Sequence, residues 1–180
     1  MGDVQHQLAL APPHTIRAFR GPEDTIRTMV GLVKGQRGEH SVYLRSLTEQ
    51  VTRGLQPKDY FSEIIAVRNF CTERIRYMND PLTLELVKDP QRLAEEIVAK
   101  GKAVGDCDDI AALSAAMLRQ LGRNAQFVTV GFGKPGHYSH VFTRVQEPKS
   151  QKWFVCDPVA GTDEGTMLRR VKTYRFWTID

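Results

Sequence analysis

The segment from Ile110 to Leu121 is apolar on nearly every face that a helix would present. Gly122 follows the segment and the acidic run Gly105-Asp106-Cys107-Asp108-Asp109 precedes it, which predicts a helix over 108–121. A helix that is apolar all round is stable only where other elements cover it on every side. The chain is therefore expected to fold around this helix, with Cys107 at its N-terminal end.

Cys107 stands where a thiolate is favoured, because free N–H groups and the helix dipole stabilise an anion there. Asp106, Asp108 and Asp109 surround it. Their carboxylates argue against deep burial of Cys107, but they also raise the pKa of a nearby thiol. The simpler alternative is a buried structural cysteine, since free cysteine behaves as a small hydrophobe. We interpret Cys107 as a nucleophile.

Residues downstream supply the partners that a thiol nucleophile needs. His140 opens a strand-like run that ends at Val145, and Asp157 closes another that starts at Trp153. A histidine takes the thiol proton, and a carboxylate holds that histidine in the right tautomer. His137 is a rival base, but it follows a glycine in a loop, so we expect it to be a loop residue or a residue at the rim of the substrate site. Asp157 has a simpler alternative role as a turn residue before a proline.

The order and placement of these residues resemble the transglutaminase-like superfamily. The three matching motifs are Gly105-Asp106-Cys107-Asp108-Asp109, His140-Val-Phe-Thr-Arg-Val145 and Trp153-Phe-Val-Cys-Asp157-Pro158, within roughly residues 75–160. The resemblance implies a papain-like α+β fold and a catalytic triad of Cys107, His140 and Asp157, with no cofactor and no metal. It also implies an oxyanion site formed by the backbone N–H of the nucleophile and an upstream side chain. Phe142 stands where family members often carry Trp.

Periodicity independently predicts an α+β chain in which helices come first and strands follow. We expect an N-terminal arm over 1–22 and one domain over 23–180, with a helical part 23–122 and a sheet part 123–180. Helices are predicted from a cap at Asp24, from Ser41, from about Pro57 and from Asp89-Pro90, the last ending at Gly101. Strands are predicted over 126–130, 141–145, 153–156 and 174–178.

Size and charge exclude several classes of protein. A chain of 180 residues with a net charge of +4 fits one globular domain without a nucleic-acid or membrane partner. The small basic cluster at Arg169, Arg170, Lys172 and Arg175 is interpreted as a solvated face. Three cysteines and no signal peptide favour a reducing, cytoplasmic location. Cys71 and Cys156 are expected in the core.

Two further patterns are interpreted as accidental. Gly131-Phe-Gly133-Lys-Pro-Gly136 spells a dinucleotide motif, but Pro135 and the following strand predict a hairpin loop. Cys107, His137, His140 and Cys156 lack zinc-site spacing. Cys156 and Asp157 also lie on opposite faces of a strand, so only one of them can point toward His140.

Two functions of different class remain. The first is thiol-dependent acyl transfer on a peptide or protein amide, with hydrolysis favoured over cross-linking because no calcium loop or additional sandwich domain is evident. The second is a structural or assembly role with the same fold, because small chains of this type resemble proteins encoded among phage structural genes. In that case we expect the protein in the virion rather than in the cytoplasm, with virion or assembly proteins as its partners.

Overall fold

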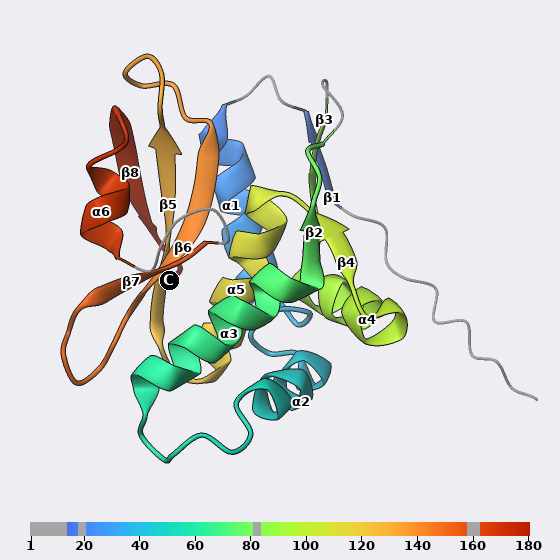
Figure 1. Ribbon diagram of the computed structural model, residues 1–180. Helices are drawn as coiled ribbons and strands as arrows, with labels where there is room; N and C mark the ends of the chain where they lie inside the picture. Colours follow the sequence, from blue (N-terminus) through green and yellow to red (C-terminus); the bar gives the residue numbers. More distant parts are fainter. Residues whose placement is uncertain (1–13, 18–20, 81–83, 158–162) are drawn as a thin grey trace, which may run out of the picture.

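The computed structural model describes residues 14–17, 21–80, 84–157 and 163–180 (Figure 1). Its helices are α1 (Pro22–Lys34), α2 (Val42–Val51), α3 (Tyr60–Arg74), α4 (Pro90–Lys100), α5 (Cys107–Gln120) and α6 (Glu164–Leu168). Its strands are β1 (His14–Arg17), β2 (Ile75–Tyr77), β3 (Leu84–Val87), β4 (Ala103–Gly105), β5 (Asn124–Gly131), β6 (His140–Gln146), β7 (Trp153–Cys156) and β8 (Thr173–Thr178). The expected α+β class is confirmed. Within the described residues, no helix is long and apolar enough to cross a membrane.

Local signals set the ends of two helices as predicted. The Ser41 hydroxyl accepts a hydrogen bond of 3.0 Å from the backbone N–H of Leu44 at the start of α2. Asp89 accepts one of 2.9 Å from the N–H of Arg92, and Pro90 is the first residue of α4. Gly101 ends α4 with a φ of 77°, a left-handed conformation that glycine adopts without a steric penalty.

Two predicted helix starts were wrong. Helix α1 begins at Pro22 with Gly21 as its N-cap, so Asp24 lies inside the first turn. Proline suits this place because its fixed φ is helical and its missing N–H would have no partner there. Helix α3 begins at Tyr60 rather than near Pro57, because Asp59 supplies the cap by accepting a hydrogen bond from the N–H of Ser62.

The four predicted strands form one antiparallel sheet in the order β7-β6-β5-β8. Strand β5 leads into β6 through a hairpin over the glycine-rich run, which confirms the loop interpretation of that pattern. Side chains alternate between two faces. Phe127, Val141 and Val145 join the main core under α5, whereas Val128 and Phe142 pack with Met167 of α6 on the other face.

Four short strands were not predicted. Strand β1 pairs antiparallel with β3, and β2 pairs in parallel with β4. Three or four residues are too few to show a period, so nothing in the sequence indicated them. Strand β1 lies within the segment predicted as an extended arm over 1–22; residues 1–13 and 18–20 of that segment lie outside the described residues.

Helix α5 lies at the centre of the fold, as its composition requires. It packs against β5 and β6 on one side and contacts α1, α2, α3 and α4 on the others (Figure 1). Every residue from Asp108 to Leu118 is buried. The N-terminal end of α5 therefore emerges between the sheet and the helices, and it carries Cys107 to that place.

Candidate active site

Cys107 is the first residue of α5 and is partly exposed, which distinguishes it from the other two thiols. Cys71 and Cys156 are buried, as predicted, at 2% and 1% exposure. Burial raises the pKa of the Cys156 thiol to about 12 and also raises the pKa of Cys71. Asp106 is the N-cap residue of α5 but makes no side-chain cap hydrogen bond. Of the three thiols, Cys107 is therefore the accessible one, and it lies at the positive end of a helix dipole.

His140 and Asp157 are in direct contact, as the sequence predicted. His140 is the first residue of β6, and its Nε2 contacts the Oδ2 of Asp157, which directly follows β7. Their side chains are 12% and 1% exposed, so the pair is largely shielded from water. An ionised carboxylate only accepts hydrogen bonds, so Nε2 carries the proton in this pair. Nδ1 is then the nitrogen that remains to accept a proton.

A hydrogen bond fixes the strand of His140 against the helix of Cys107. The buried Thr143 hydroxyl of β6 donates to the backbone oxygen of Ala111 in α5, at 2.7 Å. Ala111 lies one helical turn after Cys107, and Thr143 lies three residues after His140. This contact sets the register between the two elements close to both candidate catalytic residues.

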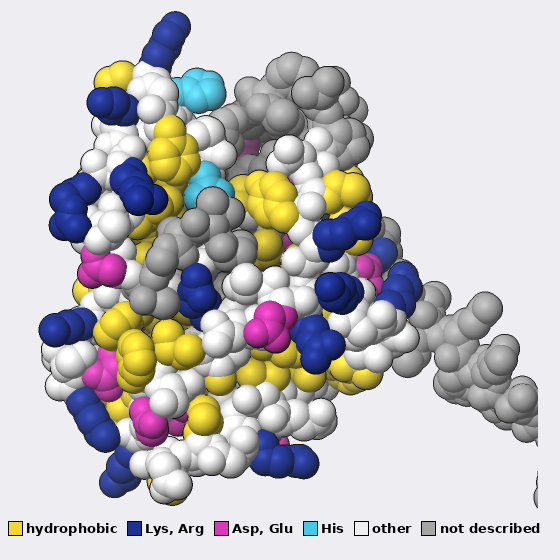
Figure 2. All heavy atoms as spheres, in the orientation of Figure 1, with side chains coloured by type: hydrophobic (Ala, Val, Ile, Leu, Met, Phe, Trp, Pro, Cys, Tyr) yellow, Lys and Arg dark blue, Asp and Glu magenta, His cyan; other side chains and the backbone are white. Residues whose placement is uncertain are grey.

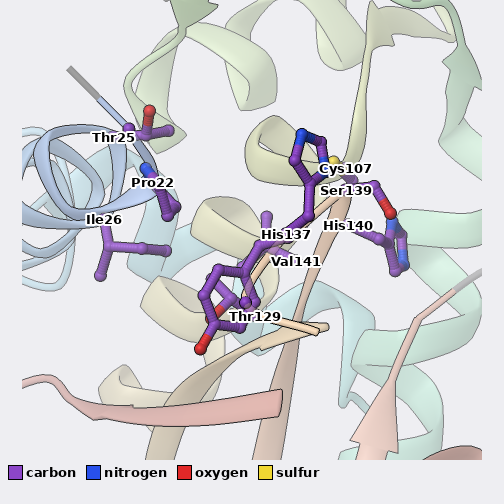
Figure 3. A pocket seen from close by; sticks show the side chains of 12 residues that line it. Pro22, Thr25, Ile26, Cys107, Thr129, His137, Ser139, His140 and Val141 are labelled. Atoms are coloured by element: carbon purple, nitrogen blue, oxygen red, sulfur yellow. The ribbon is translucent and has the colours of Figure 1, made fainter. Parts of the chain in front are cut away.

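Cys107 and His140 line one pocket of about 460 Å³. Figure 3 shows Cys107, Ser139 and His140 together at one side of this pocket, with Pro22, Thr25 and Ile26 of α1 at the other. His137 also lines the pocket but is exposed, in agreement with its predicted place at the rim. His140 is the histidine that a carboxylate holds in a fixed position, as a general base requires.

The close turn beside the pocket depends on Gly131. A Cβ at this position would lie 1.9 Å from the backbone oxygen of His137, so only glycine allows the approach. The N–H of Ser139 donates to the oxygen of Val130 at 2.9 Å and closes the same turn. Residues 136–141, which follow the hairpin tip and begin β6, line the pocket.

Tyr77 is a site residue that the sequence did not indicate. Tyr77 is 45% exposed. Its remaining burial, the nearby negative charges of Cys107 and the aspartates, and a hydrogen bond with Cys107 raise the pKa of its hydroxyl. In the parallel pair of β2 and β4, Tyr77 lies opposite Gly105. Gly105 is two residues before Cys107 in the chain. That pairing is a long-range contact, so local sequence carries no signal for it.

Figure 2 shows hydrophobic side chains gathered beside histidine on the face between the sheet and the helices.

The three carboxylates next to Cys107 in the chain lie in the interior rather than at the surface. Asp106, Asp108 and Asp109 are 7%, 1% and 1% exposed. From these carboxylates the sequence predicted that Cys107 is not deeply buried; Cys107 is partly exposed, but the carboxylates themselves are buried. Within the described residues, one oxygen of each lies within 4.8 Å of the other two, so the trio could hold a cation.

Lys88 binds one member of this trio. Asp109 accepts a hydrogen bond of 2.8 Å from the backbone N–H of Lys88, and its other oxygen lies 3.5 Å from the Lys88 ammonium. Burial raises the pKa of Asp109 to about 7, against the opposing effect of Lys88. A Cβ on Gly105 would lie 2.8 Å from the Asp109 carboxylate, so this tight packing needs glycine. Asp109 therefore joins the end of β3 to the first turn of α5.

The zinc interpretation requires Cys156 to point toward the histidines, and it does not. Cys156 packs in the main core with the residues that face α5. Its neighbour Asp157 meets His140 instead, as the alternation of strand faces demands. Pro158, which ends the third sequence motif, lies outside the described residues.

Solved structures share the fold of this chain. A candidate cysteine protease from Cytophaga hutchinsonii superimposes with a TM-score of 0.52 at 14% identity, over 91% of this chain and 57% of that one. A candidate protease from Parabacteroides distasonis ATCC 8503 gives a TM-score of 0.51 at 14% identity, over 72% of this chain and 26% of that one. At such identity the likeness concerns the fold, and the chain spans only part of either protein. No curated protein matches the chain.

A family model provides the assignment that these structures cannot. The model described as the transglutaminase-like superfamily matches residues 45–158, which is more than half of the chain. The matched region contains Tyr77, Cys107, His140 and Asp157, whereas α1 lies before it. The expected resemblance is confirmed, and the chain belongs to the transglutaminase-like superfamily.

Proposed function

We propose that the protein is a thiol-dependent acyl-transfer enzyme that acts on amide bonds of a peptide or protein, with Cys107, His140 and Asp157 as its triad. The contact between His140 Nε2 and Asp157 is the observation that carries this proposal, because it leaves Nδ1 as the basic nitrogen. His140 and Cys107 line the same pocket, where a substrate carbonyl can reach both. Membership of the superfamily and the likeness to candidate proteases support a papain-like reaction.

The reaction starts with transfer of the Cys107 proton to Nδ1 of His140. The thiolate then attacks the amide carbonyl, and a carbon–sulfur bond forms while the carbonyl oxygen takes the negative charge. The backbone N–H of Cys107, at the first residue of α5 and the positive end of the helix dipole, is the proposed first donor to that oxygen. The Tyr77 hydroxyl, which already donates to Cys107, is the proposed second donor.

Collapse of this intermediate breaks the carbon–nitrogen bond, and His140 gives its proton to the leaving amine. The acyl group stays on sulfur as a thioester until water or another amine removes it. We favour water, so the products are a carboxylic acid and an amine, as in a peptidase or amidase. A structural role in a phage-like assembly is the alternative, and it requires no reactive thiol.

A peptide library incubated with the protein tests the proposal, with products identified by mass spectrometry in the presence and absence of added primary amine. Hydrolysis products that need Cys107 are expected, and a Cys107→Ala variant should give none while it melts at a similar temperature. Amine adducts in place of acids would indicate cross-linking chemistry. If the wild-type protein turns over no peptide and Cys107 is no more reactive than a free thiol, the assembly role is favoured.

A further inference from the structure

The pocket beside Cys107 has a wall that the family match does not cover. Pro22, Thr25 and Ile26 come from α1, which ends at Lys34, whereas the matched region begins at residue 45 (Figure 3). The opposite side carries Cys107 and His140. Whatever binds between these two sides contacts both the reacting groups and a helix that is not part of the matched family region.

The floor of this pocket is apolar. Ile26 and Val141 are 2% and 7% exposed and belong to the main core. Thr129 also lines the pocket, but its hydroxyl already accepts a hydrogen bond of 2.9 Å from the indole N–H of Trp177. Its polar atom is therefore engaged within the sheet. The floor offers a ligand apolar contact rather than free hydrogen-bonding groups.

The described residues that line the pocket include no Asp, Glu, Lys or Arg. A charged side chain placed there would lose its hydration and meet no Asp, Glu, Lys or Arg among these residues, which is unfavourable. The volume of about 460 Å³ lies within the range of roughly 300–1,000 Å³ that is usual for sites of small ligands. Size and chemistry thus favour an uncharged, bulky group.

We propose that this α1 pocket binds an apolar side chain of the substrate, of the size of leucine or phenylalanine, next to the carbonyl that Cys107 attacks. The inference rests on the proposed acyl transfer, and it names the substrate class of the same site. The pocket should favour a bulky apolar side chain over none by at least about tenfold, as apolar pockets commonly do. Helix α1 then determines which peptide bond is cleaved.

Thr25 allows a direct test because it lies in the first turn of α1 and lines the pocket without forming its buried floor. Thr25→Trp should fill the space, and Thr25→Leu is a smaller change if the first variant does not fold. Arg27→Trp is the matched control, since Arg27 is exposed on the same helix and does not line the pocket. Circular dichroism and melting temperature establish that each variant is folded.

Binding is measured in the Cys107→Ala background, so that it does not depend on the chemical step. The ligands are the N-acetyl amides of phenylalanine, leucine, glycine, glutamate and lysine, and affinity is read by ligand-detected NMR titration. The phenylalanine and leucine amides should bind at least about tenfold more tightly than the other three. This preference should disappear with the Thr25 variant and persist with Arg27→Trp.

Equal affinity for the five amides, or a preference for a charged one, would overturn the inference. So would a preference that Thr25→Trp leaves unchanged. Alkylation of Cys107 by iodoacetamide in the otherwise unmodified protein reports separately on the proposed function. Selective binding with an unreactive thiol would remove the acyl-transfer proposal and, with it, the substrate role of the pocket; a reactive thiol with unselective binding would remove the pocket inference alone.

Discussion

Tyr77 lies opposite Gly105 in the parallel pair of β2 and β4, and this register places the Tyr77 hydroxyl where it donates to Cys107. The backbone N–H of Met78 donates to the oxygen of Gly105 at 3.0 Å, which extends the same pairing by one residue. The backbone of Tyr77 is therefore fixed beside the residue two positions before Cys107. This relationship gives Cys107 a neighbour that only the tertiary structure supplies.

Tyr77→Phe removes the hydroxyl while it keeps the ring. We expect kcat on a cleaved peptide to fall by roughly 100-fold with little change in KM, since loss of one oxyanion donor commonly costs that much. The rate of Cys107 alkylation at neutral pH should also fall, because the hydroxyl stabilises the thiolate. Tyr174→Phe, on the exposed strand β8, serves as a control that should change neither. An unchanged kcat would exclude Tyr77 from the oxyanion site.

The three thiols should differ in reactivity toward iodoacetamide. Cys107 is partly exposed, whereas Cys71 and Cys156 are buried and burial raises the pKa of both. In the folded protein Cys107 should be alkylated at least about tenfold faster than the other two, since the thiolate is the reactive form. Peptide mapping by mass spectrometry over a time course measures all three in one sample. Similar rates at three sites in a folded sample would contradict the assignment.

The two histidines should contribute very unequally. His140→Ala should lower kcat/KM by about 1,000-fold or more, because it removes the proposed base that Asp157 holds in place. His137→Ala changes an exposed residue at the rim and should cost no more than about tenfold. Asp157→Asn should also lower kcat/KM by at least about 100-fold, because an amide at this position favours the wrong tautomer of His140. The reverse order of the two histidine variants would move the base to the hairpin loop.

Asp109 should make the stability of the protein depend on pH. Its pKa is raised from 3.8 to about 7 by burial, so the folded state holds this proton more tightly than the unfolded state. Stability should therefore decrease as pH rises from about 4 to about 7, where the unfolded chain has already lost the proton. Asp109→Asn keeps an oxygen that can accept from the Lys88 N–H but removes the titration.

The measurement is urea unfolding of the wild type and of Asp109→Asn at pH 5 and pH 8. From pH 5 to pH 8, the free energy of unfolding of Asp109→Asn should rise relative to that of the wild type by roughly 1–3 kcal/mol. Asp59→Asn is a suitable control, since Asp59 titrates with a lowered pKa and should change relative stability little within this range. A constant difference between Asp109→Asn and wild type at both pH values would show that Asp109 is ionised throughout.

Chelation should leave the protein unchanged. The carboxylate of Asp109 is bound to Lys88, and acyl transfer by a thiol needs no ion. EDTA is thus expected to change neither the melting temperature nor the alkylation rate of Cys107. An ion that binds the folded state raises its melting temperature by mass action. Since we expect no ion to bind, added calcium or zinc should raise the melting temperature by no more than about 1 °C. A clear rise would identify Asp106, Asp108 and Asp109 as a cation site.

Local residue patterns determined much of this protein. The continuous apolar surface of residues 110–121 required a central helix, and Ser41, Asp89 and Gly101 determined helix ends, because caps act over three or four residues. The helix ends depend on neighbours close in the chain, so the sequence alone predicts them. Alternation in β7 predicted that only one of Cys156 and Asp157 faces His140, and the packing of β7 against β6 shows that it is Asp157.

Tertiary structure decided the rest of the site. The pairing of Tyr77 with Gly105, the contact of Lys88 with Asp109 and the position of Thr25 beside the pocket each join segments separated in the chain. No periodicity reports such contacts, because they depend on how the elements pack around α5. The sequence by itself therefore predicted a nucleophile, a base and an orienting carboxylate. Packing decided which distant residues lie near them, since those contacts form only when distant segments meet.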